Sequence, residues 1–435
     1  MARSVQPVDE NHLEKTVKLL TFNTWGLKYV SKLRKERLRA IADKLATEQD
    51  GDYDIVALQE IWVEEDWKYI EERCKKQFPY RRIFKSGIIT GPGLALLSKI
   101  PIESTFLYRF PINGRSSAFF RGDWYVGKGI AVTLLKPHTP GSTPIALLNS
   151  HMHAPYSHTG DSSYACHRSC QAWDFVKIVK MLKKSGYAVI QVGDLNSKPG
   201  SLPYKLFTIE GGLVDSWESI YGANANDEII EPEEIGTMTF EDQILIGGVT
   251  CDSKLNTWRA NRQPWEACRL DYALVDSTHI STVNAQVRFT ERLEPPYNCS
   301  YSDHFAYSAE FLIKASDNSR ISKSAFSSSE RIDVFKEFLL NLQEYQRYTI
   351  PEQTNWRRFH FFAGIITLII FHFLMPWCAK ISPYLALLVL FFSTVLGITA
   401  VLNGLIWYFG VRSEARALEE VQMEVEDNLT SLKDE

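Results

Sequence analysis

The sequence Ala-Val-Ile-Gln-Val-Gly-Asp-Leu-Asn-Ser, residues 188–197, joins an apolar run to a cluster of polar side chains. Ala188–Val192 is rich in β-branched residues, which is typical of a buried β-strand. The residues after it, Gly193-Asp194-Leu195-Asn196-Ser197, place a carboxylate and an amide directly at the end of that strand. Ligand sites of α/β sheets lie outside the ends of strands. The stretch therefore predicts a sheet with a functional site at one edge.

Four other segments repeat this arrangement of an apolar run followed by polar residues. They are Phe22-Asn23-Thr24-Trp25-Gly26, Leu58-Gln59-Glu60, Ser150-His151-Met152-His153 and Ser302-Asp303-His304-Phe305. Each is ambiguous by itself, since Asn-Thr is common in turns, Gly-Asp-x-Asn can form an Asx turn and Ser-Asp-His can cap a helix. A single histidine on an apolar strand is also more often a core residue than a catalytic one. The combination and order of the segments favour one shared site.

The polar residues of these segments are carboxylates, amides and imidazoles, without a cluster of thiols. Hard oxygen ligands suit Mg²⁺, which binds through one or two carboxylates and keeps several waters. An imidazole is suited to proton transfer near neutral pH. We therefore expect Mg²⁺ as the cofactor of this site. The candidate residues are Asn23, Glu60, His151, Asp194, Asn196, Asp303 and His304.

Residues 17–314 read as one domain in which apolar, β-branched runs alternate with helical stretches such as Arg34–Ala46 and Cys166–Lys184. Some neighbouring runs are separated only by turns, which favours a mixed sheet over a purely parallel one. The predicted strands are Val17–Phe22, Ile55–Leu58, Leu94–Leu97, Ile130–Leu135, Ile145–Asn149, Ala188–Val192 and Tyr272–Val275.

The C-terminal part of the chain has a different composition. Two segments, 359–377 and 384–411, contain no Asp, Glu, Lys or Arg, and each is long enough to cross a bilayer as a helix. The alternative is a pair of buried core helices. The remaining segments are a polar N-terminal segment at 1–16, a Ser-rich linker at 315–330, an amphipathic juxtamembrane helix at 331–358 and a charged tail at 412–435.

Charge and cysteine usage predict the location of the chain. Arginines at 357, 358, 412 and 416 flank the two apolar segments, whereas only Lys380 lies between them. Because positive residues stay in the cytosol, the catalytic domain and the tail are expected there. The N-terminus lacks the apolar stretch of a signal peptide, and the seven scattered cysteines are expected to be reduced thiols. A net charge of −4 gives no basic field for nucleic acid.

The segment Gly122-Asp123-Trp124-Tyr125-Val126-Gly127-Lys128-Gly129 matches the spacing of a nucleotide-binding P-loop. A P-loop needs Ser or Thr after the lysine and then a helix. Here Gly129 takes that position and Ile130–Leu135 reads as a strand, so a glycine-bent hairpin is the simpler interpretation.

In order and combination, the five segments resemble those of the endonuclease/exonuclease/phosphatase superfamily. Within it, the chain is similar to the neutral sphingomyelinase branch, and above all to the fungal inositol phosphosphingolipid phospholipases C, along nearly its whole length. The stretches that look specific to this branch are Phe22–Gly26, Gly91–Ile102, Ser150–Pro155, His167–Phe175 and Gly193–Pro203.

This resemblance implies an α+β fold, namely a DNase I-like two-layer β-sandwich flanked by helices, followed by a C-terminal two-helix transmembrane hairpin. It implies a phospholipase C that hydrolyses inositol phosphosphingolipids, and sphingomyelin as well, to ceramide and a phosphorylated headgroup. The expected location is the endoplasmic reticulum or mitochondrial membrane. The headgroup preference, phosphoinositol or phosphocholine, stays open.

The resemblance also implies roles for the residues that act on water and metal. Glu60 resembles the direct Mg²⁺ ligand, with Asn23 beside it or bridged by water. His304 looks like the general base that deprotonates the attacking water. Asp271, in the segment Arg269-Leu270-Asp271-Tyr272, looks like the carboxylate that orients this histidine.

Three further residues are similar to groups that act on the phosphate. Asp194 and Asn196 resemble a pair that positions it, and His151 resembles a donor to its oxygens, where charge develops during the reaction. Asp123 and Lys128 match an Asp–Lys pair that is regarded as a conformational switch in neutral sphingomyelinases.

The expected partners are a sphingolipid substrate, the membrane itself and anionic phospholipids as activators. Gly397 and Gly404 would let apolar helices approach closely, which is compatible with a homodimer. Two other functions compete with this interpretation. One is an inositol polyphosphate phosphatase of the same fold, whose Pro-x-Trp-Cys-Asp-Arg motif the segment 262–269 resembles only faintly and with different spacing. The other is a membrane scaffold without catalysis.

Overall fold

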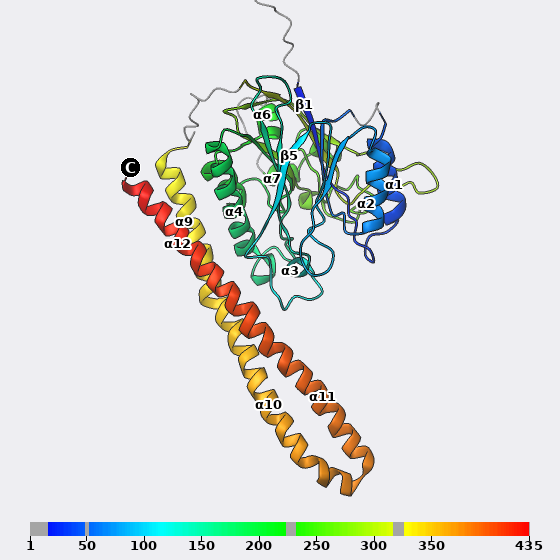
Figure 1. The fold of residues 1–435 in the computed structure, drawn as a ribbon, viewed down its shortest axis with the longest axis vertical. Coiled ribbons are helices and arrows are strands. Elements are labelled where there is room, and N and C mark those ends of the chain that lie inside the picture. Colours follow the sequence, from blue (N-terminus) through cyan, green and yellow to red (C-terminus); the bar gives the residue numbers. More distant parts are fainter. Residues whose placement is uncertain (1–15, 48–51, 223–231, 316–325, 435) are drawn as a thin grey trace, which may run out of the picture. The chain divides into compact units, whose positions relative to one another are not determined.

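The structure is a computed structural model that describes residues 16–47, 52–222, 232–315 and 326–434 (Figure 1). Residues 1–15 of the predicted N-terminal segment 1–16 and residues 316–325 of the predicted linker 315–330 lie outside the described residues, whereas Thr16 begins a strand. The chain forms two compact units. The first comprises Met1–Arg109, Val126–Met152 and Ala172–Ser327, and the second comprises Phe110–Tyr125, His153–Gln171 and Ser328–Glu435.

The first unit contains two six-stranded mixed sheets. One has the strand order β11-β12-β1-β2-β4-β3 and the other β5-β6-β7-β8-β10-β9. The strands of the first sheet are β1 Thr16–Asn23, β2 Ile55–Gln59, β3 Tyr80–Ile83, β4 Ala95–Ser98, β11 Ile280–Arg288 and β12 Ala306–Ile313. Those of the second are β5 Ile102–Arg109, β6 Gly129–Leu135, β7 Ile145–His151, β8 Ala188–Asp194, β9 Val214–Asp215 and β10 Asp271–Val275. The predicted two-layer α+β fold is confirmed.

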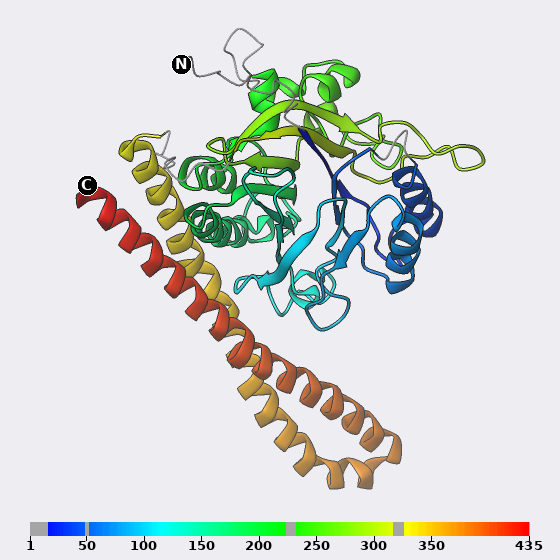
Figure 2. The same ribbon diagram turned by 45° about the horizontal axis from the view of Figure 1, so that its top comes forward.

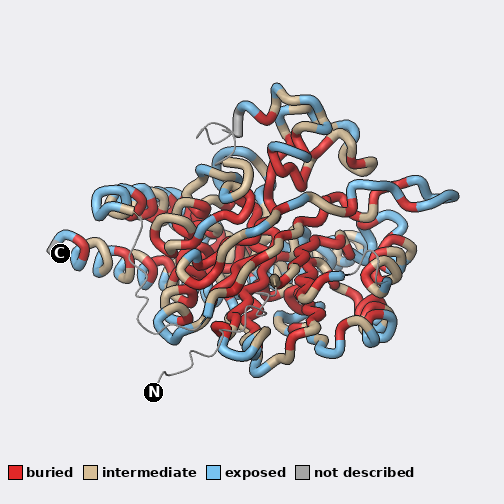
Figure 3. The backbone as a smooth tube through the Cα atoms, turned by 90° about the horizontal axis from the view of Figure 1, so that it is seen from above, coloured by how far each residue is buried: buried red, intermediate tan, exposed pale blue. Residues whose placement is uncertain are grey.

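Alternation of side chains along the strands builds the core between the two sheets. In β1, Val17 and Leu19 belong to the core of the sandwich, in which Ile190 of β8 also packs. On the other face of β1, Leu20 and Phe22 pack against α1 (Arg34–Leu45) and α2 (Glu64–Cys74). The strands are rich in buried residues, and Figure 3 shows buried segments of the backbone tube in red and exposed ones in pale blue.

Strand direction brings the predicted site segments to one edge. β1 pairs in parallel with β2, and β7 pairs in parallel with β8, so the carboxyl ends of each pair coincide. Gln59 donates to Thr21 Oγ1 of the same sheet at 3.0 Å and to Asn149 Oδ1 of the other sheet at 2.7 Å. The buried hydrogen bond to Asn149 ties the two sheets together just beneath the strand ends, which gives Gln59 a structural role.

Helices and turns complete the connections of the sandwich. Gly129 begins β6, so a strand follows the Gly-rich segment where a P-loop would need a helix. The longest of these helices, α4, covers Ala165–Lys184. The others are α3 Asp123–Val126, η1 Asp161–Ser163, α5 Leu202–Lys205, η2 Leu206–Glu210, α6 Ser216–Tyr221, α7 Pro232–Ile235, α8 Phe240–Leu245 and η3 Pro264–Glu266.

The second unit is dominated by a long helical hairpin. Its elements are α9 Ser328–Glu344, η4 Tyr345–Thr349, α10 Ile350–Ile381, α11 Pro383–Leu405, η5 Ile406–Val411 and α12 Arg412–Asp434. α10 and α11 run side by side (Figures 1 and 2). Close approach depends on small residues, because a Cβ atom at Gly364 would meet Ala400 and one at Gly404 would meet Phe361. Gly404, which was predicted to let helices approach closely, therefore lies at the contact between the two helices of the hairpin.

The two predicted membrane segments fall within these helices. Both are long and apolar enough to cross a membrane, with mean hydropathies of 2.0 and 2.6 over their most apolar windows. Only 6% and 11% of those windows are buried inside the protein. Core helices of a soluble protein bury their apolar side chains. The exposure therefore favours membrane spans over the alternative of buried core helices.

Candidate functional site

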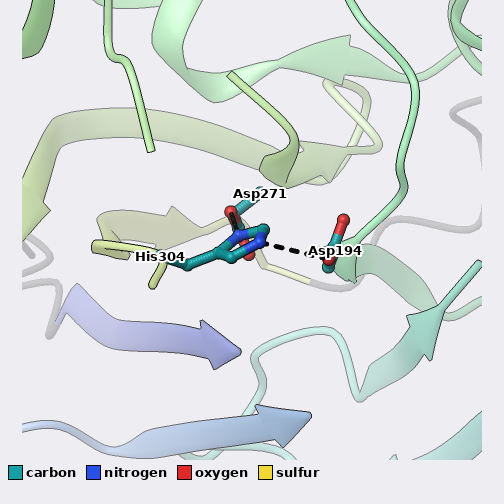
Figure 4. A group of neighbouring side chains, drawn as sticks. All are labelled: Asp194, Asp271 and His304. Carbon is teal, nitrogen blue, oxygen red and sulfur yellow. Dashed lines mark hydrogen bonds and ion pairs between the residues drawn. The ribbon is translucent and has the colours of Figure 1, made fainter. Parts of the chain in front are cut away.

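Asp194, Asp271 and His304 meet at the edge of the sandwich where the predicted segments end (Figure 4). Asp194 ends β8 and Asp271 begins β10, and the antiparallel register places the two residues opposite each other. His304 precedes β12. Its Nδ1 lies 2.8 Å from Asp271 Oδ2, and its Nε2 lies 3.8 Å from Asp194 Oδ2. One carboxylate thus holds the ring, while the other nitrogen faces the second carboxylate.

The environment of His304 changes its affinity for a proton. Burial disfavours the charged imidazolium, but Cys251 together with the carboxylates of Asp271 and Asp194 outweighs burial and raises the pKa of His304 well above its ordinary value. Asp271 Oδ1 has no hydrogen-bond partner among the described residues. The hydrogen bond through Oδ2 therefore defines the orientation of the imidazole.

Glu60 and Asn23 lie on the other side of Asp194. Asn23 Nδ2 donates to Glu60 Oε1 at 3.1 Å and to Asp194 Oδ2 at 3.0 Å, so two carboxylates converge on one amide. Burial, together with the charge of Asp303, raises the pKa of Glu60 to about 7. Burial is also the main cause that raises the pKa of Asp194 to about 6. Asp194 is buried and Glu60 is half-buried, and two carboxylates crowded in this way fit a divalent cation, which would relieve their repulsion.

The turn after β8 places Asn196 and His151 around the same carboxylate. Asn196 N donates to Asp194 Oδ1 at 3.0 Å, and Asn196 adopts a left-handed conformation with φ 46°. His151, at the end of β7, has its Nε2 3.6 Å from Asp194 Oδ2. Seven predicted residues are therefore brought together at this site. They are Asn23, Glu60, His151, Asp194, Asn196, Asp271 and His304.

Lys128 lies next to these residues through a shared backbone carbonyl. Its Nζ donates to Met152 O at 2.8 Å, and Asn196 Nδ2 donates to the same oxygen at 3.1 Å. Asp123, its predicted switch partner, belongs to the other unit. There the Asp123 carboxylate accepts from Tyr156 OH at 2.7 Å and lies 3.7 Å from His153 Nε2.

Sequence reasoning gave no role to two residues that support the site. Arg37 is fully buried, and its guanidinium donates to the carbonyls of Thr24, Trp25 and Tyr301. It therefore joins the loop after Asn23 to the loop before His304. Nothing in its helical sequence context could have revealed this role, because its partners are backbone atoms.

Asp303 is the second such residue. Arg259 donates to its carboxylate at 2.6 Å, which orients Asp303 beside Glu60. The sequence identified Asp303 as part of a polar segment. Its charge raises the pKa of Glu60 only because the two side chains are close in the folded protein, which the sequence could not show.

Comparisons with known proteins identify the family of the chain. Residues 20–304 match the family described as the Endonuclease/Exonuclease/phosphatase family. The chain is 49% identical to the inositol phosphosphingolipids phospholipase C of Saccharomyces cerevisiae, over 97% of this chain and 91% of that protein. It is 37% identical to the protein of the same name in Schizosaccharomyces pombe, over 89% and 88%.

More distant similarities extend to animal and bacterial proteins. The chain is 29% identical to sphingomyelin phosphodiesterase 2 of Rattus norvegicus, over 72% of this chain and 69% of that protein. Among solved structures, sphingomyelinase C from Streptomyces griseocarneus superposes with a TM-score of 0.48 at 19% identity. That superposition covers 68% of this chain and 99% of the other.

Proposed function

The chain belongs to the endonuclease/exonuclease/phosphatase family and, within it, to the inositol phosphosphingolipid phospholipases C, and from this premise we propose a Mg²⁺-dependent phospholipase C. It hydrolyses inositol phosphosphingolipids, and sphingomyelin as well, to ceramide and a phosphorylated headgroup. The observation that carries the proposal is the His304–Asp271 pair, which faces Asp194 beside the half-buried Glu60 side chain.

In the proposed reaction, His304 accepts a proton from the attacking water at Nε2. Asp271 keeps Nδ1 occupied, so that Nε2 is the nitrogen that faces the reacting atoms. Water attacks phosphorus as the bond from phosphorus to the ceramide oxygen breaks in line with it. The departing ceramide oxygen takes up one proton, which balances the proton that His304 accepts and later releases. Asp194 and Asn196 position the phosphate, and His151 donates to its oxygens. No covalent bond forms between enzyme and substrate.

Glu60 is the proposed direct ligand of the metal, with Asn23 beside it. The donors are carboxylate and amide groups, which suit Mg²⁺ better than a soft metal. When bound, the metal would stabilise charge on the phosphate oxygens. Its positive charge would also oppose protonation of His304, and this would counteract the raised pKa of that imidazole.

The competing functions receive less support from the geometry. Arg269, which the phosphatase-like segment would offer to a phosphate, is buried and paired with Asp215 and Glu218. A scaffold without catalysis would not need to preserve the hydrogen bond between His304 and Asp271 or the convergence of Glu60 and Asp194 on Asn23.

The proposal predicts the bond that is cut. Purified chain in detergent with Mg²⁺ should act on inositol phosphosphingolipid, sphingomyelin and phosphatidylinositol to different extents when these are assayed in parallel. Mass spectrometry should detect ceramide as the lipid product and phosphoinositol or phosphocholine as the soluble product. Free phosphate would identify a phosphatase instead, ceramide phosphate would identify a phospholipase D, and no turnover of any substrate would support a scaffold.

For the membrane topology, we propose that both termini face the cytosol at the endoplasmic reticulum or mitochondrial membrane. The arginines that flank α10 and α11 outnumber the single lysine between them, as expected for cytosolic flanks. Protease added to sealed organelles should remove N-terminal and C-terminal epitopes, and protection of both would reverse this assignment.

Anionic phospholipid should raise kcat through the region next to the membrane. Arg358, Arg412 and Arg416 are exposed, whereas Arg357 is buried. Each exposed basic residue near an anionic surface contributes about 1 kcal/mol of attraction. Lys128 is the proposed gating residue, since it shares the Met152 carbonyl with Asn196.

The measurement compares activity in mixed micelles with and without phosphatidylserine or cardiolipin. Wild type should be stimulated, while Lys128→Ala and a variant with Arg358, Arg412 and Arg416 replaced by alanine should respond weakly. Equal stimulation of all three proteins would mean that the lipid acts only by presenting the substrate.

A further inference from the structure

Two loops of the first unit expose large apolar side chains to solvent. In the loop between β1 and α1, Tyr29 is 90% exposed and Val30 is 67% exposed. In the loop between β3 and β4, Ile88 is 73% exposed and Ile89 is 68% exposed. Single exposed apolar residues are ordinary, but adjacent pairs at the tips of two loops indicate a surface that contacts something apolar.

Both loops border the candidate active site. β1, β2 and β3 run in the same direction, because β1 pairs in parallel with β2, and β2 and β3 both pair antiparallel to β4. The loop after β1, the residue Glu60 after β2 and the turn between β3 and β4 therefore lie at one edge. Thr24 N also donates to Gln59 O at 3.1 Å, and Ile61 N donates to Gly93 O at 2.9 Å.

Glycines allow the loops to approach the backbone next to Glu60. A Cβ atom at Gly26 would lie 2.0 Å from Glu60 O, and a Cβ atom at Gly93 would lie 3.0 Å from the ring of Trp62. The loop after β1 therefore passes one side of the Glu60–Trp62 segment, and the loop that leads into β4 passes the other side, because β2 lies between β1 and β4 in the sheet.

Basic residues alternate with the apolar ones in the first loop. Lys28 and Lys32 are exposed, as are Leu27 before Lys28 and Leu33 after Lys32, and the exposed Lys35 follows in the first turn of α1. The second loop is preceded by the exposed Lys85, whose Nζ also lies 3.4 Å from the exposed carboxylate of Glu64. Apolar tips with neighbouring lysines suit the boundary between the acyl chains and the headgroups of an anionic membrane. A purely apolar protein partner would leave these lysines without an anionic partner.

We propose that residues 27–33 and 86–90, here called the interfacial loops, insert into the bilayer that holds the substrate. Their lysines contact anionic headgroups at the same time. This inference rests on the proposed function, because a phosphodiester at the bilayer surface must reach carboxylates that are buried in the protein. Membrane helices keep an enzyme at the bilayer, but they do not by themselves turn its active site toward the lipid.

Insertion can be measured without any catalysis. The full chain carrying Val30→Cys or Ile89→Cys is labelled with a nitrobenzoxadiazole fluorophore and placed in nanodiscs of phosphatidylcholine and phosphatidylserine. Six of the seven native cysteines are buried, and unsubstituted chain corrects for labelling of Cys378. Nitroxide groups on the acyl chains should quench both labels. Ser104→Cys, exposed at the far end of β5 from the site, serves as the unquenched control.

A comparison of activity on bilayer and on dispersed substrates gives an independent test. Its control is the same kind of substitution at an exposed apolar residue elsewhere. Tyr29→Asp combined with Val30→Asp should lower the ratio of activity on bilayer substrate to activity on dispersed short-chain substrate by about tenfold. Val283→Asp, which changes a residue that is 50% exposed on β11, should leave that ratio unchanged.

The outcomes separate this inference from the proposed function. Absence of quenching at positions 30 and 89, or an unchanged activity ratio in the double variant, would overturn membrane insertion. Failure of the wild-type chain to hydrolyse either form of substrate would overturn the proposed function, while quenching of the two labels would still support the interfacial loops.

Discussion

Replacement of His304 by alanine should lower kcat by at least about 100-fold, the lower range of the contribution that general acid–base groups make. The variant lacks the group that we propose accepts the proton from water, and nothing else among the described residues presents an imidazole held by Asp271. Asp271→Asn should also lower kcat, because the amide would no longer favour the correct orientation and protonation of the ring. Initial rates on a verified lipid substrate measure both effects.

The chain contains a matched control for this substitution. His279 is also buried, and its Nδ1 lies 2.9 Å from Asp276 Oδ2, so it forms the same kind of pair away from the site. His279→Ala should reduce thermal stability without a comparable loss of kcat. Near-normal kcat in His304→Ala, or equal losses in the two variants, would show that the base has been assigned to the wrong residue.

Removal of metal should abolish turnover, and added Mg²⁺ should restore it. EDTA treatment followed by titration with Mg²⁺ measures this requirement. Glu60→Gln should raise the Mg²⁺ concentration for half-maximal activity by at least about tenfold, because an amide replaces the proposed anionic ligand. Glu210→Gln is the matched control, since Glu210 is a buried carboxylate that accepts a hydrogen bond from Lys180 outside the site. Full activity of metal-free protein would exclude this interpretation of the site.

The metal requirement should also depend on pH in a defined direction. The pKa of Glu60 is raised to about 7, so below that pH the carboxyl is protonated and must release its proton before it binds a cation. The Mg²⁺ concentration for half-maximal activity should therefore rise as pH falls below about 7, by up to about tenfold per pH unit. Above that pH it should level off. Glu60→Gln should lose this dependence.

Local sequence patterns were sufficient for the framework of this protein. Alternating or continuous apolar runs such as Ala188–Val192 predicted strands, and the spacing in Arg34–Ala46 predicted a helix, because these patterns reflect contacts between residues close in the chain. The apolar segments 359–377 and 384–411 predicted two long helices, which the structure contains. The polar residues at strand ends predicted which side chains would meet, although the roles assigned to them stay predictions.

Tertiary structure alone decided how those side chains are held. Asp194 and His304 are 110 residues apart, and their 3.8 Å separation follows from the packing of the two sheets, because Asp194 ends β8 of one sheet and His304 precedes β12 of the other. Arg37 bonds to carbonyls on two distant loops, which leaves no trace in composition or spacing.

The grouping of the chain into two units is a further example. The segments Phe110–Tyr125 and His153–Gln171 lie within the predicted catalytic domain in sequence, yet they form one compact unit with Ser328–Glu435. Within that unit, Glu414 of α12 accepts hydrogen bonds from His167 and from Tyr345, and Arg115 donates to Tyr345. Sequence periodicity reports how a segment folds on itself, whereas these contacts depend on which surfaces meet after the segments have folded.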